Sequence, residues 1–174
     1  MLVPIDDTNG DPIALSRMRF GTKPSTNSNT EAWILGHTCA AVNCRALATL
    51  DPSQTYMGTW HDSTANADIV TSVSVDFVGS AVYVKAVLAG PNPPEFMGGL
   101  DPEYYISING TAAGTFKQPA PSTDRSGPQF LYNITIYENT TLPFGRHSLN
   151  VDAGRTGGPQ VLFLLDAILY DDAL

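Results

Sequence analysis

Hydrophobic and polar residues alternate with a period of two along most of the chain, as they do in β-strands whose two faces meet different surroundings. The alternating runs, of which the last two are weaker, are 69–78, 80–88, 103–108, 131–137, 147–152, 161–170, 13–20 and 54–60. No stretch of about 11 residues or more keeps a helical period of 3.6. The pattern therefore predicts about eight strands and no long helix.

Segments rich in proline and glycine separate these runs and mark turns and loops. Three of them are long, at 21–31, 89–102 and 114–129, whereas Val-Gly-Ser at 78–80 is short enough for a tight hairpin. The chain holds 13 Pro and 15 Gly, and neither a linker nor an internal repeat divides it. We therefore predict an all-β fold, a single antiparallel β-sandwich over residues 1–174.

Composition and charge exclude some classes of binding partner for this predicted domain. Of the 174 residues 43% are hydrophobic, enough for a core, but only 15% are charged, against about 25% in an average domain. The net charge is −8, the isoelectric point is near 4.5 and no cluster of lysines or arginines exists, which argues against nucleic acid and anionic membranes. No apolar run approaches the roughly 18 residues of a membrane span, so we expect no membrane contact by this domain.

Sequons and cysteines indicate an extracellular setting. Three Asn-x-Thr sequons begin at Asn109, Asn133 and Asn139, and each is an acceptor motif for an N-linked glycan. Four residues separate the two cysteines, Cys39 and Cys44, which form either a local disulfide in an oxidising compartment or two buried thiols. The first residues lack the basic start and apolar stretch of a signal peptide. We nevertheless expect a secreted protein or the extracellular part of a cell-surface protein.

Acidic residues near both ends of the chain raise the question of a metal ion. The segment IDDTNGD contains Asp6 and Asp7, and Asp166 stands alone in the most apolar run of the chain. Ca²⁺ takes six to eight oxygen ligands, which clustered carboxylates and carbonyls supply, and a buried carboxylate needs a partner. A Ca²⁺ ion that joins Asp166 to the N-terminal acids meets both conditions. A capped turn, with Asp166 paired to backbone N–H groups or an arginine, meets them as well.

The stretch GTWHDST places Trp60, His61 and Asp62 side by side. Together with Trp33 and Tyr56 these residues offer flat aromatic faces and directional hydrogen-bonding groups, the combination that binds a sugar ring. In the alternative interpretation Trp60 is a core residue, and His61 and Asp62 only fix a loop.

Catalytic motifs are weak in this sequence. The three histidines, His37, His61 and His147, lie outside any nucleophile-elbow motif. No spacing identifies the two carboxylates that a glycosidase places on either side of the scissile bond. The sequence therefore predicts a protein that is not an enzyme.

A set of motifs follows one order along nearly the whole chain. They are IDDTNGD (5–11), AW (32–33), the cysteine pair, GTWHDST (58–64), VDFVGSAVYV (75–84), YNITIY (132–137), LPFGRHSLNV (142–151) and LFLLDAILY (162–170). In this order they resemble a largely uncharacterised extracellular domain family that is abundant in mushroom-forming fungi. The chain departs from that family where Leu165-Asp166-Ala167 stands in place of an aromatic-containing FDY.

The resemblance implies a jelly-roll sandwich of the galactose-binding-like kind, as in many carbohydrate-binding modules. Domains with this architecture often hold a structural calcium ion between an acid near the first strand and an aspartate in the last. Carried over to this chain, the resemblance implies Asp6 or Asp7 together with Asp166 as calcium ligands.

These observations favour a non-catalytic carbohydrate-binding domain that takes fungal cell-wall glycans. In this hypothesis Trp60 stacks on a sugar ring, and His61 and Asp62 bind its hydroxyls. The alternative is a structural or adhesion ectodomain that acts through protein contacts, and it predicts a buried Trp60. A glycoside hydrolase or polysaccharide lyase is the third hypothesis, and it requires a cleft with two carboxylates at catalytic separation.

Overall fold

A computed structural model describes residues 1–13, 16–23, 32–36, 50–93, 102–118 and 126–173. Across these residues it contains eleven strands, two short 3₁₀ turns that precede β4, and no helix long and apolar enough to cross a membrane. In chain order the elements are β1 (Leu2–Asp6), β2 (Arg19–Lys23), β3 (Trp33–Leu35), η3 (Pro52–Gln54), η4 (Tyr56–Gly58), β4 (His61–Ala65), β5 (Val70–Gly79), β6 (Ala81–Ala89), β7 (Glu103–Ile108), β8 (Thr111–Lys117), β9 (Phe130–Asn139), β10 (Gly145–Ala153) and β11 (Val161–Asp171).

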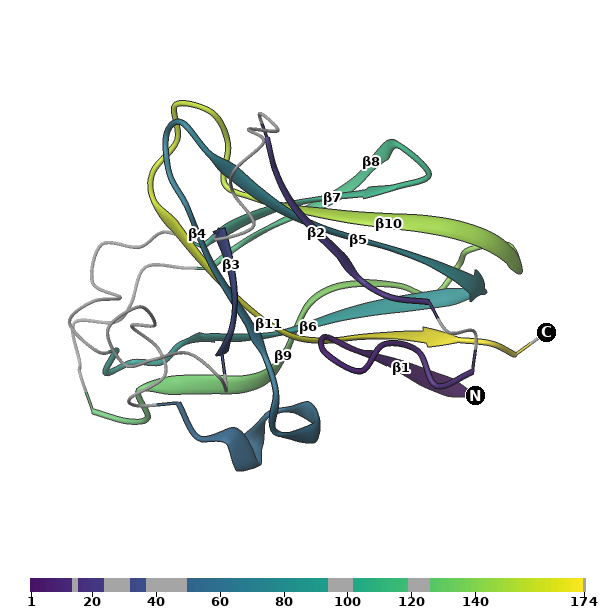
Figure 1. Ribbon diagram of the computed structural model, residues 1–174, viewed down its shortest axis with the longest axis horizontal. Helices are drawn as coiled ribbons and strands as arrows, with labels where there is room; N and C mark the ends of the chain where they lie inside the picture. The colour runs from purple at the N-terminus through teal and green to yellow at the C-terminus, as the bar shows by residue number, and fades with distance from the viewer. Residues whose placement is uncertain (14–15, 24–31, 37–49, 94–101, 119–125, 174) are drawn as a thin grey trace.

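The strands form two antiparallel sheets that pack face to face (Figure 1). One sheet has the order β3-β4-β11-β6-β9, with β1 paired to β11, and the other has the order β2-β5-β10-β7-β8. The eight strands from β4 to β11 thus run as β4-β11-β6-β9 over β5-β10-β7-β8, which is the strand order of a jelly roll. The predicted all-β, antiparallel sandwich is confirmed, and with it the jelly-roll arrangement.

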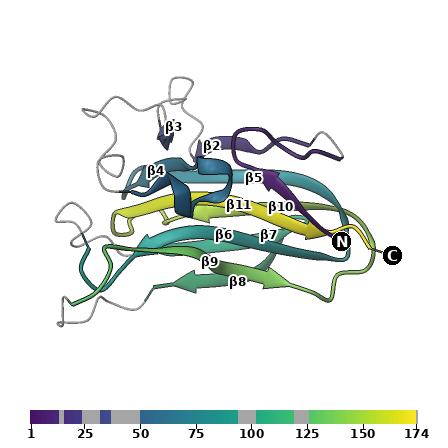
Figure 2. The same ribbon diagram turned by 90° about the horizontal axis from the view of Figure 1, so that it is seen from below.

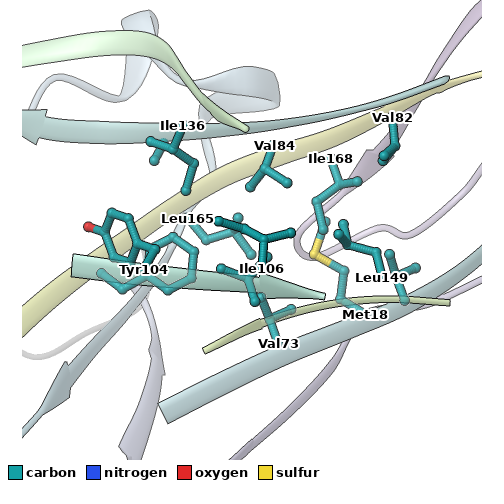
Figure 3. Close-up of a cluster of buried hydrophobic side chains, with 14 of the residues drawn as sticks. Met18, Val73, Val82, Val84, Tyr104, Ile106, Ile136, Leu149, Leu165 and Ile168 are labelled. Carbon is teal, nitrogen blue, oxygen red and sulfur yellow. The ribbon is translucent and has the colours of Figure 1, made fainter. Parts of the chain in front are cut away.

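The core lies between the two sheets and follows the period-two pattern of the sequence. Val73, Val75 and Phe77 of β5 are buried on the inner face, and the inner residues of β6, β7, β10 and β11 close over them. Figure 3 shows part of this cluster, in which Met18, Tyr104 and Leu165 come from three different segments. The hydroxyl of Tyr104 donates a hydrogen bond of 2.9 Å to the carbonyl of Leu162, so this large buried side chain leaves no polar atom unsatisfied.

A second hydrophobic cluster covers the outer face of the six-stranded sheet. It contains Leu50, Trp60, Val87, Ala89, Phe130, Leu162 and Leu164. Strand β11 is therefore buried on both sides, with Phe163 and Leu165 facing the first cluster and Leu164 facing the second. Burial on both faces explains why this segment is a continuous apolar run instead of an alternating one.

Two local predictions are wrong. Val-Gly-Ser at 78–80 does not close a hairpin, because β5 and β6 belong to different sheets and the chain crosses between them there. Gly79 allows this crossing, since a Cβ atom at that position would lie 2.3 Å from the carbonyl oxygen of Asp171. The weak run 54–60 is not a strand either, because η3 and η4 occupy it and β4 begins at His61.

Strand β9 departs from simple alternation because it contains bulges. Asn133 adopts a left-handed conformation with φ 54°, and the pairing of β9 with β6 shifts register around it. Ile134 and Ile136 consequently face the core, whereas Tyr132 packs against the outer cluster beside Phe130. The sequence pattern had predicted Tyr132, Ile134 and Ile136 on one face, which is wrong for Tyr132.

Candidate functional site

A hollow of about 280 Å³ lies at the edge of the sandwich where β1, β3, β4 and the segment before β2 meet. It combines acidic, basic and apolar walls, and the residues that line it are Asp6, Asp7, Thr8, Gly10, Arg17, Met18, Phe20, Leu35 and His61. Of the sequence-predicted candidates this hollow brings together His61, Asp6 and Asp7.

His61 is held in one orientation on the wall of this hollow. Its Nδ1 lies 2.6 Å from Oδ2 of Asp7, whose side chain is completely buried. Its ring stacks on Phe20 with the centroids 4.0 Å apart and the planes inclined by 11°. No described residue hydrogen-bonds to Nε2 of His61, so this nitrogen keeps its hydrogen-bonding capacity on a residue that lines the hollow. A neutral imidazole whose Nδ1–H points at Asp7 presents Nε2 as an acceptor.

Arg17 contributes a positive charge at the same hollow. Its side chain is exposed and forms no ion pair with a described acid. Two nearby cations do have acidic partners, Arg19 with Asp76 and Lys23 with Asp152. With no ion pair to any acid in the described part of the chain, the guanidinium of Arg17 has N–H donors to offer a ligand.

Oxygen atoms crowd around the hydroxyl of Thr59 behind the hollow. The Thr59 Oγ1 atom lies 3.2 Å from Oδ2 of Asp6, 2.5 Å from Oδ1 of Asp7 and 3.3 Å from the carbonyl oxygen of Tyr56. A hydroxyl has one proton to donate, so two of these three acceptors receive none from it. Such a surplus of oxygen acceptors over donors is the chemistry that a hard cation neutralises.

Asp166 approaches this group through strand pairing. β1 pairs with β11 so that Asp6 stands opposite Ala167, and the backbone N–H of Tyr56 donates a 2.6 Å hydrogen bond to Oδ1 of Asp166. Burial, with a smaller contribution from the charges of Asp7 and Asp6, raises the pKa of Asp166 to about 6. Asp6 and Asp7 are thus near enough to Asp166 to act on its charge, but no three His, Cys, Asp or Glu side chains of the described residues form a set that could hold a metal ion, so the calcium site stays a prediction.

The turn after β1 orients these acids. The backbones of Asp6 and Gly10 exchange two hydrogen bonds of 3.0 Å, and Oδ1 of Asp6 accepts from the backbone N–H groups of Thr8 and Asn9. Gly10 has φ 81°, and a Cβ there would lie 2.9 Å from the carbonyl oxygen of Ser16. The glycine is therefore needed both for the turn and for the close approach of the segment before β2.

The two tryptophans do not offer a sugar platform, and this prediction is wrong. Trp60 is 0% exposed in the outer cluster, with Gly36 packed directly on its indole nitrogen. Trp33 is 8% exposed, packs against Phe20 and Phe163, and donates from Nε1 to the carbonyl of Gly21. Trp33 thus belongs to the cluster between the two sheets and Trp60 to the outer cluster.

Asp62 and Tyr56 also lie away from the hollow. Strand alternation turns Asp62 to the face opposite His61, where it is buried and where desolvation raises its pKa to about 6. Tyr56 is half-buried and serves the acidic group through its backbone N–H and carbonyl. Of the five predicted ligand-binding residues, only His61 lines this hollow.

Sequence reasoning missed Arg17, Met18, Phe20 and Leu35 as lining residues. The run 13–20 was too weakly patterned to mark Arg17, Met18 and Phe20, and Leu35 reaches His61 only through the pairing of β3 with β4. The predicted disulfide of Cys39 and Cys44 lies outside the described residues.

No protein-family model matches the chain, and no curated protein matches it either. Solved structures of similar fold include the carbohydrate-binding module TmCBM61 in complex with beta-1,4-galactotriose, with 10% identity over 88% of both chains and a TM-score of 0.44. They also include the Agl-KA catalytic domain, with 13% identity and a TM-score of 0.47. A third is the catalytic domain of a GH87 alpha-1,3-glucanase in complex with nigerose, with 10% identity and a TM-score of 0.40. All of this chain aligns with only 28% of each of those two. At these values the similarity assigns neither a binding site nor an activity to this chain.

Proposed function

We propose that this protein is a non-catalytic, extracellular glycan-binding domain that takes a neutral sugar unit in the hollow beside His61. The observation that carries the proposal is the fixed imidazole on the wall of the hollow, which Asp7 and Phe20 hold while Nε2 has no hydrogen-bond partner among the described residues. A preorganised group loses little conformational freedom on binding, which favours affinity for a small ligand.

The walls of the hollow match the chemistry of a sugar. A hydroxyl group both donates and accepts, so it can donate to Nε2 of His61 while a second hydroxyl accepts from Arg17. Met18, Phe20 and Leu35 supply apolar surface for the C–H groups of the ring. The volume of about 280 Å³ is near the lower end of ligand pockets, roughly 300–1,000 Å³, and suits one sugar unit better than several.

Charge supports a neutral ligand over an acidic one. The hollow contains two carboxylates, Asp6 and Asp7, against one free guanidinium, and the whole chain carries −8. A polyanionic glycan would meet a repulsive field at this surface. Neutral glucans, mannans and chitin fragments of fungal cell walls are therefore the ligands to test first.

Calorimetric titration with soluble oligosaccharides of these three classes tests the proposal. We expect saturable binding by the wild type and its loss in His61→Ala, while the control Thr64→Ala, an exposed position on the same strand, binds normally. No binding of any neutral oligosaccharide at millimolar concentration would overturn the proposal. Release of shortened products from the polysaccharides would show an enzyme instead.

The burial of Trp60 favours a second candidate function. An ectodomain that acts through protein contacts was expected to keep this ring in its core, where it lies. This candidate predicts capture of a protein partner that no sugar competes away and that His61→Ala leaves unchanged.

We further propose a structural calcium ion at the oxygen group around Thr59. The chain fits such an ion, because Asp6, Asp7 and the carbonyl of Tyr56 present more acceptors than Thr59 can satisfy, and Asp166 lies close enough for their charges to raise its pKa. When bound, Ca²⁺ supplies positive charge that offsets the repulsion of these carboxylates. The residues that would hold it tie the turn after β1 to β11.

A further inference from the structure

The three sequons all lie on one side of the sandwich. Asn133 and Asn139 belong to β9, the last strand of the six-stranded sheet, and Asn109 precedes β8, the last strand of the five-stranded sheet. Figure 2 shows β8 and β9 together along one edge, with β2, β3 and β4 along the other. The hollow beside His61 is at that second edge, so a glycan on β9 would leave it open.

The side chain of Asn109 makes hydrogen bonds that stabilise a turn. Asn109 and Gly110 form the tight turn between β7 and β8, with φ values of 53° and 77°, as an Asn-Gly hairpin requires. Oδ1 of Asn109 accepts from the backbone N–H of Ser148 at 2.9 Å, and its Nδ2 lies 3.1 Å from Nδ1 of His147. Because Nε2 of His147 donates to the carbonyl of Pro143, its Nδ1 accepts a hydrogen bond from Nδ2 of Asn109.

The side chain of Asn139 also makes hydrogen bonds. Its Oδ1 accepts from both the backbone N–H and the hydroxyl of Thr141, at 3.0 and 3.1 Å, and the residue is half-buried. The threonine that would serve as its sequon hydroxyl is therefore part of a local turn.

Asn133 differs from both. It is exposed, it stands in a bulge with φ 54°, and its side chain makes no hydrogen bond to a described residue. The Thr135 hydroxyl of the same sequon accepts a 2.6 Å hydrogen bond from Lys85 on the neighbouring strand. The amide of Asn133 thus projects from the strand with nothing to displace.

The strand that carries Asn133 needs protection. β9 has ten residues and is paired on one side only in the described part of the sheet, so backbone N–H and C=O groups along its other side lack strand partners. Edge strands avoid pairing with another chain through lysine, proline or bulges, and of these β9 has only the bulges. In Phe130–Asn139 the only charge is Glu138 and proline is missing, while aromatic and β-branched residues predominate. Such a composition favours edge-to-edge association.

We propose that an N-linked glycan on Asn133 shields the open edge of β9. In the secretory pathway Nδ2 of Asn133 bonds to the anomeric carbon of an oligosaccharide carried on a lipid diphosphate. The bond from that carbon to the phosphate oxygen breaks, Nδ2 loses one proton, and the lipid diphosphate leaves. The proposal shares the secretory route with the proposed function but does not depend on the hollow.

The attachment is tested by secreting the full chain from a eukaryotic host and mapping glycopeptides by mass spectrometry. We expect Asn133 to be the most occupied of the three sequons and Asn109 the least. Thr135→Ser keeps the sequon and should keep the glycan, whereas Thr135→Ala, a change of similar size, should lose it. An unoccupied Asn133 in the folded, secreted protein overturns the proposal.

The shielding is tested by light scattering on the same proteins over a range of concentrations. We expect the glycosylated wild type to stay monomeric and Asn133→Gln to associate increasingly with concentration, while the protein stays folded. Asn133→Lys, which also lacks the glycan, should return to the monomer because a charge on an edge strand opposes pairing. The proposal fails if Asn133→Gln is as monomeric as the wild type throughout the range.

Discussion

The carboxylate of Asp7 bridges two features of the candidate site. Its Oδ2 contacts Nδ1 of His61 at 2.6 Å in the hollow, while its Oδ1 contacts the hydroxyl of Thr59 in the oxygen group behind it. One buried side chain therefore links the residue that would meet a sugar to the residues that would meet a cation. The proposed glycan site and the proposed calcium site share Asp7, but only the first uses His61 and only the second uses Asp166. Substitutions at His61 and Asp166 therefore test the two sites separately.

For the hollow, the prediction concerns the orientation of His61. His61→Ala should abolish glycan binding, and Asp7→Asn should weaken it about ten- to a hundredfold, because a hydrogen bond to a charged group contributes roughly 1.5–3 kcal/mol and 1.4 kcal/mol is a factor of ten. Titration calorimetry measures both. Asp68→Asn, which removes an exposed acid outside the hollow, is the control and should bind as the wild type does. Equal affinities for Asp7→Asn and the wild type would contradict the positioning role.

For the cation, the prediction concerns thermal stability. Thorough chelation with EDTA should lower the midpoint of unfolding, and added Ca²⁺ should restore it, because an ion that binds only the folded chain stabilises it by mass action. Asp166→Asn should reduce this response, whereas His61→Ala should leave it intact. Scanning calorimetry with and without Ca²⁺ provides the measurement, and a midpoint that chelation does not move would count against the ion.

The sequence predicted the architecture well because alternation reports burial directly. In β5 and β7 every inner residue of the pattern is buried, and the order of the strands follows the jelly roll that the resemblance implied. The errors occur where one residue changes the local geometry. At Gly79 the chain crosses from one sheet to the other. At Asn133 a bulge in β9 places Tyr132 on the opposite face from the one predicted.

The candidate site was harder to predict because adjacency in sequence does not imply adjacency in space. Trp60, His61 and Asp62 are consecutive, yet the strand turns His61 to the hollow and its two neighbours to the covered outer face. Conversely, Asp7 and His61 are far apart in sequence and in contact. The pairing of β1 with β11 does bring the two ends of the chain together, with Asp6 opposite Ala167, whereas the calcium site predicted there stays a prediction.

A structural role for Trp60 predicts a large loss of stability on truncation. Trp60→Ala should lower the free energy of unfolding by about 3–5 kcal/mol, the usual cost of emptying a large buried site. Gly36→Ala should also destabilise, because its Cβ would lie 1.9 Å from the indole Nε1 of Trp60. Urea unfolding measures both losses. Thr64→Ala is the matched control on β4, and a folded Trp60→Ala of wild-type stability would contradict the burial of this ring.

The buried carboxyl of Asp62 should make the stability of the protein depend on pH. Burial raises its pKa to about 6, above the 3.8 of the unfolded chain. The folded state therefore favours the protonated acid, and the stability from this group is complete below pH 3.8 and lost as pH rises through about 6. Near pH 7 the ionised Asp62 costs on the order of 3 kcal/mol. Asp62→Asn keeps the shape without the charge, so its melting temperature should exceed that of the wild type at pH 7–8. The difference should vanish toward pH 4, and a constant difference across this range would show that Asp62 does not titrate as its burial requires.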